Sequence, residues 1–169
     1  MRRAALAAGL VALALLACSG EPGGGARASG AASPAPSFVL PDLAGGSFDL
    51  AEQRGKTVVI DFWATWCPPC VFQVPELNAF WRRHREAGNV MVVGVAVDAE
   101  GAAVVGPWVE EQGVEYPIVI GDEALAREFG ALGFPTLVIV APDGRIESSH
   151  VGLIEADELE GIVVQARSS

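Results

Sequence analysis

The sequence predicts one α/β domain with a mixed central β-sheet flanked by helices. Its 169 residues suffice for a single domain with a real core, and hardly for two. Apolar runs that fit buried strands alternate with stretches of helical spacing, which is typical of βαβ units and a mainly parallel sheet. The turn signal Ala141-Pro142-Asp143-Gly144 separates the last two apolar runs, so we expect these strands to pair antiparallel.

The expected elements follow in order. Residues 38–43 and 47–50 flank Ala44-Gly45-Gly46 and predict a short N-terminal hairpin. We expect strands at 57–63, 90–97, 116–120, 136–140 and 145–151. Helices are expected at 68–87, 122–129 and 156–165, with one more that begins at or before Pro107 and ends at Gly113. The first helix has an apolar stripe of Val71, Val74, Leu77 and Trp81, and Pro75 lies within it.

The N-terminus predicts export. Met1-Arg2-Arg3 precedes an apolar block, residues 4–17, that is too short to span a bilayer as a stable helix. Its end, Leu15-Leu16-Ala17-Cys18, resembles a bacterial lipoprotein signal, which implies cleavage after residue 17 and lipidation of Cys18. An ordinary secretory signal and an uncleaved anchor are the alternatives. We expect residues 18–37, rich in Gly, Ala, Ser and Pro, to form a disordered tether ahead of a domain at 38–169.

The net charge and the number of cysteines limit the possible functions of the protein. The formal net charge is −10, and an acidic domain without basic clusters argues against nucleic acid as a partner. Cys18 as the anchor leaves one pair, Cys67 and Cys70, and no cysteine for a structural disulfide.

The pair lies in Asp61-Phe62-Trp63-Ala64-Thr65-Trp66-Cys67-Pro68-Pro69-Cys70, at a strand-to-helix junction. The first N–H groups of a helix lack internal partners and carry the positive end of its dipole. A thiolate is stabilised there, so the thiol pKa should fall. We interpret Cys67 as the nucleophile and Cys70, one turn into the helix, as the shielded resolving thiol.

Other interpretations of the pair are weaker. A structural disulfide that closes so short a loop removes little chain entropy from the unfolded state. Half a zinc site would need a second Cys-x-x-Cys or His pair, which the chain does not have. Two unrelated core cysteines remain an alternative.

Residues 62–70, Phe-Trp-Ala-Thr-Trp-Cys-Pro-Pro-Cys, resemble the thioredoxin superfamily, and more closely its membrane-tethered TlpA/ResA-like branch. The resemblance covers roughly residues 38–165 and implies a thioredoxin-like fold with an N-terminal hairpin. It implies a thiol–disulfide oxidoreductase that acts on protein disulfides outside a bacterial membrane, without a cofactor. Because the periplasm is kept oxidising, we expect a reductant served by a membrane electron donor. We also expect a monomer on a lipid anchor, facing the periplasm or exterior, with cytochrome c maturation as one process it serves.

The resemblance also assigns site residues. Pro135, in Gly133-Phe134-Pro135-Thr136, matches a proline that is cis and packs against the cysteines; a simple strand-initiating proline is the alternative. Trp66, Pro68 and Phe134 are expected to bind substrate, Phe134 through its backbone groups.

Asp61 and Gln73 bear on proton transfer. Asp61 lies in a strand that is expected to be buried on both faces, so its pKa should rise. It matches an acid that accepts the proton of the resolving cysteine, and the alternative is an aspartate facing water at a strand edge. Gln73 departs from the glutamate that members serving cytochrome c maturation often have, and glutamine cannot exchange a proton.

Two rival functions remain. Soft thiolates favour Cu(I), so Cys67, Cys70 and His150 could bind copper in a copper-delivery lipoprotein, although copper proteins of this fold usually space their cysteines more widely. A lipoprotein that merely binds a partner through the fold is the third possibility.

Overall fold

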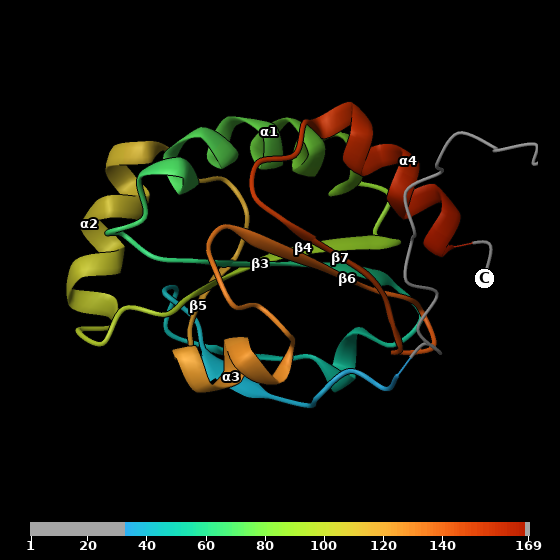
Figure 1. The fold of residues 1–169 in the computed structure, drawn as a ribbon, viewed down its shortest axis with the longest axis horizontal. Coiled ribbons are helices and arrows are strands. Elements are labelled where there is room, and N and C mark those ends of the chain that lie inside the picture. Colours follow the sequence, from blue (N-terminus) through green and yellow to red (C-terminus); the bar gives the residue numbers. More distant parts are fainter. Residues whose placement is uncertain (1–32, 168–169) are drawn as a thin grey trace, which may run out of the picture.

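The computed structural model describes residues 33–167; the expected signal peptide, Cys18 and most of the expected tether lie outside this range. A five-stranded sheet runs through the domain in the order β5-β4-β3-β6-β7 (Figure 1). Its strands are β3 (Thr57–Trp63), β4 (Val90–Ala96), β5 (Ile118–Ile120), β6 (Thr136–Val140) and β7 (Ile146–Val151). β4 runs parallel to β3 and β5, whereas β6 runs antiparallel to β3 and β7. The mixed sheet and the antiparallel end predicted from the sequence are confirmed.

Helices cover both faces of this sheet. α1 (Pro68–His84), α2 (Ala102–Gln112) and α4 (Ala156–Ala166) lie on one face, and α3 (Glu123–Glu128) lies on the other (Figure 1). The predicted hairpin of β1 (Val39–Pro41) and β2 (Ser47–Asp49) lies on the α3 side and leads into a short 3-10 helix, η1 (Ala51–Gln53). Within residues 33–167, no helix combines the length and the apolar character needed to cross a bilayer.

An aromatic cluster fills the core on the α3 side. The ring of Phe62 in β3 lies 5.4 Å from that of Phe129, and Phe129 lies 5.9 Å from Phe38. Phe38 in turn stacks on Phe48 of β2 at 6.0 Å. Successive side chains of a strand point to opposite faces, so the neighbours of Phe62 project toward α1 and α2.

α1 differs from the expected helix in its end and in its buried face. It ends at His84, before the expected residue 87. Val71 and Trp81 of the expected stripe are only half-buried, whereas Gln73 and Phe80 are fully buried. α1 packs against α4 as well as against the sheet, and this second contact buries residues outside the expected stripe.

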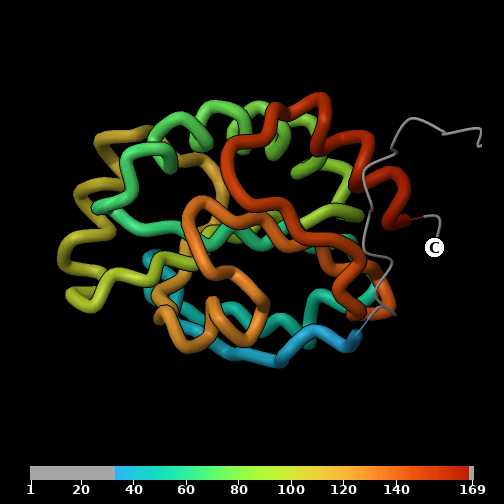
Figure 2. The backbone as a smooth tube through the Cα atoms, viewed as in Figure 1, coloured from blue at the N-terminus to red at the C-terminus, as the bar shows by residue number. Residues whose placement is uncertain are grey.

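The described chain begins against the β6–β7 turn. Ile146 donates its N–H to the Ser33 carbonyl over 2.8 Å, and Ala35 donates to the Gly144 carbonyl over 3.0 Å. Figure 2 shows this first segment, in blue, entering beside that turn. The folded part of the chain therefore includes residues 33–37, ahead of the boundary at residue 38 that composition suggested.

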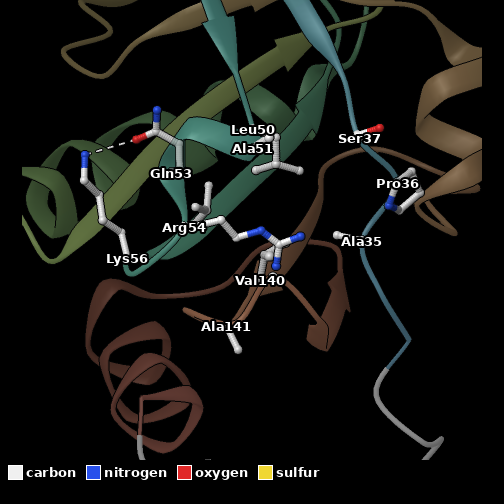
Figure 3. A pocket seen from close by; sticks show the side chains of 12 residues that line it. Ala35, Pro36, Ser37, Leu50, Ala51, Gln53, Arg54, Lys56, Val140 and Ala141 are labelled. Carbon is white, nitrogen blue, oxygen red and sulfur yellow. Dashed lines mark hydrogen bonds between the residues drawn. The ribbon is translucent and has the colours of Figure 1, made fainter.

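Arg54 helps to hold this end of the domain together. It donates a hydrogen bond to the carbonyl of Asp143, and a side chain at Gly144 would overlap its guanidinium group. Figure 3 shows Arg54 reaching between Val140 and Ala35 across the small hollow that these residues line. A glycine in the turn thus makes room for the arginine.

Candidate active site

The two cysteines lie where β3 gives way to α1, as the sequence indicates. Cys67 is the N-cap residue of α1 and Cys70 lies in its first turn. They form a disulfide with an S–S distance of 2.08 Å and a Cα–Cα distance of 5.4 Å. Both are buried, with 4% of Cys67 and 2% of Cys70 exposed. Cys67, unlike Cys70, lines a neighbouring cavity.

Two prolines alter the electrostatics expected at this helix start. Pro68 and Pro69 occupy the first helical positions, and proline has no backbone N–H to donate. The first N–H of the helix therefore belongs to Cys70, and it donates to the Cys67 carbonyl over 3.1 Å. Fewer N–H groups are available to a Cys67 thiolate than the sequence argument assumed, so the start of α1 should stabilise this thiolate less.

A buried aspartate anchors the loop ahead of Cys67. Asp98 follows β4 and is 3% exposed. Its carboxylate accepts hydrogen bonds from the Thr65 backbone N–H, over 3.1 Å, and from the Thr65 hydroxyl. Because β3 and β4 run parallel, their carboxyl ends meet at one edge of the sheet. An acid directly after a buried strand is the sequence signal for this anchor, and Asp98 was missing from the expected site.

The loop before β6 lies beside the cysteine motif. The Phe134–Pro135 peptide bond is cis, and Pro135 is buried where β6 begins opposite the end of β3. The rings of Phe134 and Trp66 meet edge to face, with centroids 5.8 Å apart. A cavity of about 450 Å³ lies between the loop and the motif. Its lining includes Trp66, Cys67, Pro68, Arg127, Leu132 and Phe134.

The rim of this cavity is apolar and exposed. Trp66 is 58% exposed and Leu132 is 83% exposed. α3 adds an ion pair to the wall, with Arg127 and Glu123 3.2 Å apart. Exposed apolar groups around a reactive sulfur suit a segment of another polypeptide better than a small ion.

Asp61 is buried on the sheet face that α1 covers. Phe62 points toward α3, so the side chain of Asp61 points the other way. Burial raises the pKa of Asp61 from 3.8 to about 7, and a hydrogen bond from the Tyr116 hydroxyl, at 3.5 Å, acts to lower it. Asp61 is 2% exposed, which excludes the alternative of a water-facing aspartate. A carboxyl with a pKa near neutrality can accept and release a proton at neutral pH.

Gln73 has a structural use in this chain. It is 1% exposed, and its amide makes two hydrogen bonds with the backbone of Ile154. Its Nε2 donates to the Ile154 carbonyl over 3.1 Å, and its Oε1 accepts from the Ile154 N–H over 3.0 Å. Glutamine supplies both a donor and an acceptor, which a carboxylate cannot do. Gln73 thus fixes the segment between β7 and α4 to α1.

The copper alternative is wrong on geometry. His150 lies on β7 opposite Leu137, and its Nε2 is 3.1 Å from the Leu153 carbonyl. Within residues 33–167, no three His, Cys, Asp or Glu side chains gather closely enough to bind a metal ion. The sequence could not show that strand β6 lies between the strand of His150 and β3, which leads to the cysteine pair.

Disulfide exchange needs one sulfur that a second molecule can reach and another that can displace that molecule. The Cys67–Cys70 pair beside the cavity meets both needs, on a thioredoxin-like sheet. The fold and site therefore define a thiol–disulfide oxidoreductase.

Comparison with known proteins identifies the family. The chain belongs to the AhpC/TSA family, whose model matches residues 31–149. It is similar to the thiol-disulfide oxidoreductase ResA of Bacillus anthracis, with 30% identity over 128 residues, or 75% of this chain and 73% of ResA. The thioredoxin-like protein YneN of Bacillus subtilis is 28% identical over 126 residues, or 75% of this chain and 74% of YneN. A crystal structure of a thiol:disulfide interchange protein from Chlorobium tepidum matches with a TM-score of 0.70 at 30% identity, over 82% of this chain and 99% of that one.

Proposed function

We propose that this protein reduces disulfide bonds in protein clients on the extracytoplasmic side of a bacterial membrane. The observation that carries the proposal is the position of Cys67 beside a cavity with an exposed apolar rim. Such a rim suits an extended client segment that brings its own disulfide to Cys67. Because the bacterial periplasm is kept oxidising, a reductant there must draw electrons from a membrane partner.

The proposed cycle starts from the reduced protein. The Cys67 thiolate attacks one sulfur of the client disulfide, forms a mixed disulfide and releases the other client sulfur as a thiolate. Cys70 then loses its proton to Asp61 and attacks the Cys67 sulfur. The bond between Cys67 and the client breaks, and the client leaves with the electron pair as a second thiolate. Two electrons have passed to the client, the Cys67–Cys70 disulfide has formed, and the membrane donor reduces it again.

Client binding is assigned to the cavity lining. Trp66 and Pro68 supply apolar surface from the cysteine motif, and Phe134 offers backbone groups to an added strand from the opposite loop. Pro135 shapes that loop beside the disulfide. Both sides of the cavity belong to one chain, which supports a monomer; light scattering of the purified protein checks this.

A lipid anchor on Cys18 would fit this arrangement. The described chain enters the domain beside the β6–β7 turn. Since β6 runs antiparallel to β3, that turn lies at the opposite end of the sheet from Cys67. The chain would therefore lead from the anchor to the end of the domain that lies opposite the cavity. Mass spectrometry of protein extracted from membranes should find the lipid on Cys18, and Cys18→Ala should release the protein; an unmodified Cys18 would contradict the anchor.

Apocytochromes c are the client class that we propose from the TlpA/ResA-like resemblance. Gln73 is occupied by its bonds to Ile154 and cannot exchange a proton, so proton transfer falls to Asp61. The test compares a disulfide-bonded Cys-x-x-Cys-His peptide with a peptide of the same composition and a different order. Faster reduction of the haem-site peptide is expected, and equal rates would remove this client class while leaving the general activity intact.

An exchange assay tests the function itself. The purified protein is mixed with a thiol donor and a disulfide-bonded protein, and reduction of the client is followed over time. Wild-type protein should accelerate the reduction, and Cys67→Ser should not. Wild-type rates no better than those of Cys67→Ser would reject the enzyme activity.

A further inference from the structure

The two oxygens of the Asp61 carboxyl have different surroundings. Oδ2 lies 3.5 Å from the hydroxyl of Tyr116, whereas Oδ1 has no hydrogen-bond partner within the described part of the chain. Asp61 is 2% exposed and Tyr116 is 5% exposed, so neither group is bathed in solvent. One oxygen is therefore held by a phenol, and the other is left available for a proton.

The surrounding structure brings Tyr116 to this position. Gly94 pairs with Asp61 across β3 and β4, and a Cβ at Gly94 would lie 3.1 Å from Cε2 of Tyr116. Such a contact is tighter than ordinary van der Waals packing, so the glycine gives the tyrosine ring its room. Asn78 of α1 holds the preceding segment: its Oδ1 accepts from the Glu115 N–H over 2.9 Å, and its Nδ2 donates to the Gly113 carbonyl over 2.8 Å.

We propose that Tyr116 is a positioning residue for Asp61, a role that rests on the proposed function of Asp61 as proton acceptor. The Tyr116 hydroxyl donates to Oδ2 and orients the carboxylate, so that Oδ1 takes the proton from the Cys70 thiol. The Cys70 thiolate then attacks the Cys67 sulfur, and the client leaves with the electron pair of the broken bond. The proton leaves Asp61 for solvent before the next cycle, and Tyr116 keeps its own proton throughout.

The other ionisable groups near Asp61 in the described part of the chain have other roles or other partners. The remaining candidates on neighbouring elements are Cys70 of α1, Asp98 after β4 and His150 of β7. Cys70 is the proton donor in the proposed step, Asp98 is hydrogen-bonded to Thr65, and His150 is separated from Asp61 by Leu137 of β6. The acids of α2 and Glu115 are exposed at the surface. Within residues 33–167, Tyr116 is the group whose hydrogen bond changes the pKa of Asp61.

Tyr116→Phe tests the proposal, because it removes the hydroxyl and keeps the ring. The hydroxyl favours the ionised carboxylate, so its loss should raise the pKa of Asp61 further. Carbon-13 NMR titration of the labelled, oxidised protein measures this pKa directly. A bond as long as this one is weak, and a rise of roughly half a unit is expected. An unchanged Asp61 titration would overturn the proposal.

A kinetic measurement distinguishes a positioning role of Tyr116 from a mere packing role. Reduced protein is mixed with excess peptide disulfide, and acid-quenched samples are resolved by mass into mixed disulfide and oxidised protein. At pH 6, Tyr116→Phe should resolve the mixed disulfide roughly threefold more slowly, because half a pKa unit lowers the ionised fraction by about that factor. The deficit should shrink above pH 8, and it should vanish in an Asp61→Asn background. A deficit that is equal at all pH values, or that persists in that background, would reduce Tyr116 to a packing residue.

The outcomes also separate this inference from the proposed function. If Asp61→Asn resolves the mixed disulfide as fast as wild type at pH 6, the proton-acceptor role fails and this inference fails with it. If Asp61→Asn is slow and Tyr116→Phe matches wild type, only the assignment of Tyr116 is lost.

Discussion

Replacing Asp61 with asparagine should stabilise the oxidised protein at alkaline pH and leave its stability nearly unchanged in acid. Asp61 is 2% exposed, and burial raises its pKa from 3.8 to about 7. Below about pH 3 the carboxyl is mostly neutral in both the folded and the unfolded state. As the pH rises, the unfolded chain ionises first and is stabilised relative to the folded chain. The free energy of unfolding therefore falls between pH 4 and pH 7.

The difference between the pKa of Asp61 in the folded and in the unfolded state sets the size of the effect. The two states differ by about three pKa units, and each unit corresponds to about 1.4 kcal/mol. The penalty therefore reaches about 4 kcal/mol and is complete by about pH 8. Asparagine has nearly the same shape and no charge, so the Asp61→Asn variant escapes this penalty.

Urea unfolding at a series of pH values from 4 to 8 measures the difference. Both proteins are kept oxidised, so that the Cys67–Cys70 disulfide is present throughout. Glu100→Gln is a matched control, because Glu100 is an exposed carboxylate before α2; its effect should stay within about 0.5 kcal/mol. A stabilisation by Asp61→Asn that does not grow with pH, or that is below about 1 kcal/mol at pH 8, contradicts the burial argument.

Three further substitutions test individual contacts. Gln73→Ala should lower the free energy of unfolding by about 3 kcal/mol, because it leaves the buried N–H and carbonyl of Ile154 unpaired; urea unfolding measures this, and a loss under about 1 kcal/mol would dismiss the contact. Gly94→Ala should lower the free energy of unfolding by about 1–3 kcal/mol in the same assay, because its Cβ would lie 2.5 Å from Cδ1 of Ile118; a neutral change would show that the Ile118 side chain moves aside easily. Leu132→Ser should alter the free energy of unfolding by less than about 0.5 kcal/mol, since Leu132 is 83% exposed. The Leu132→Ser variant should reduce a protein disulfide more slowly than wild type and a small disulfide at the wild-type rate. Equal effects on both substrates would show that the client does not bind at Leu132.

The fold could be predicted because its signals are local. The apolar run at 57–63 needs burial on both faces, and Asp143-Gly144 at the last turn fixes an antiparallel return. The features that the sequence did not predict depend on contacts between distant segments. The hydrogen bond from Ile146 to Ser33 extends the folded region into the expected tether, and no local pattern announces it.

The residues of the site also divide into those that a local pattern predicts and those that depend on distant contacts. Cys67, Cys70 and Asp61 lie within one short motif whose strand-to-helix context carries the chemistry. The partner of Asp61 is Tyr116, 55 positions away, and the loop anchor Asp98 is 33 positions from Thr65. Pairings at such separations follow from strand order, which single-residue patterns do not encode. The copper alternative failed for that reason, since β6 lies between the strand of His150 and β3.

Capture of the mixed disulfide tests the central claim most directly. Cys70→Ser protein, incubated with a disulfide-bonded client, should accumulate a covalent complex that a reductant breaks, and peptide mapping should find the client joined to Cys67. Cys67→Ser should give no such complex, because Cys70 is 2% exposed and does not line the cavity. Equal complex with both variants would contradict the assignment of Cys67, and complex with neither would contradict thiol–disulfide exchange itself.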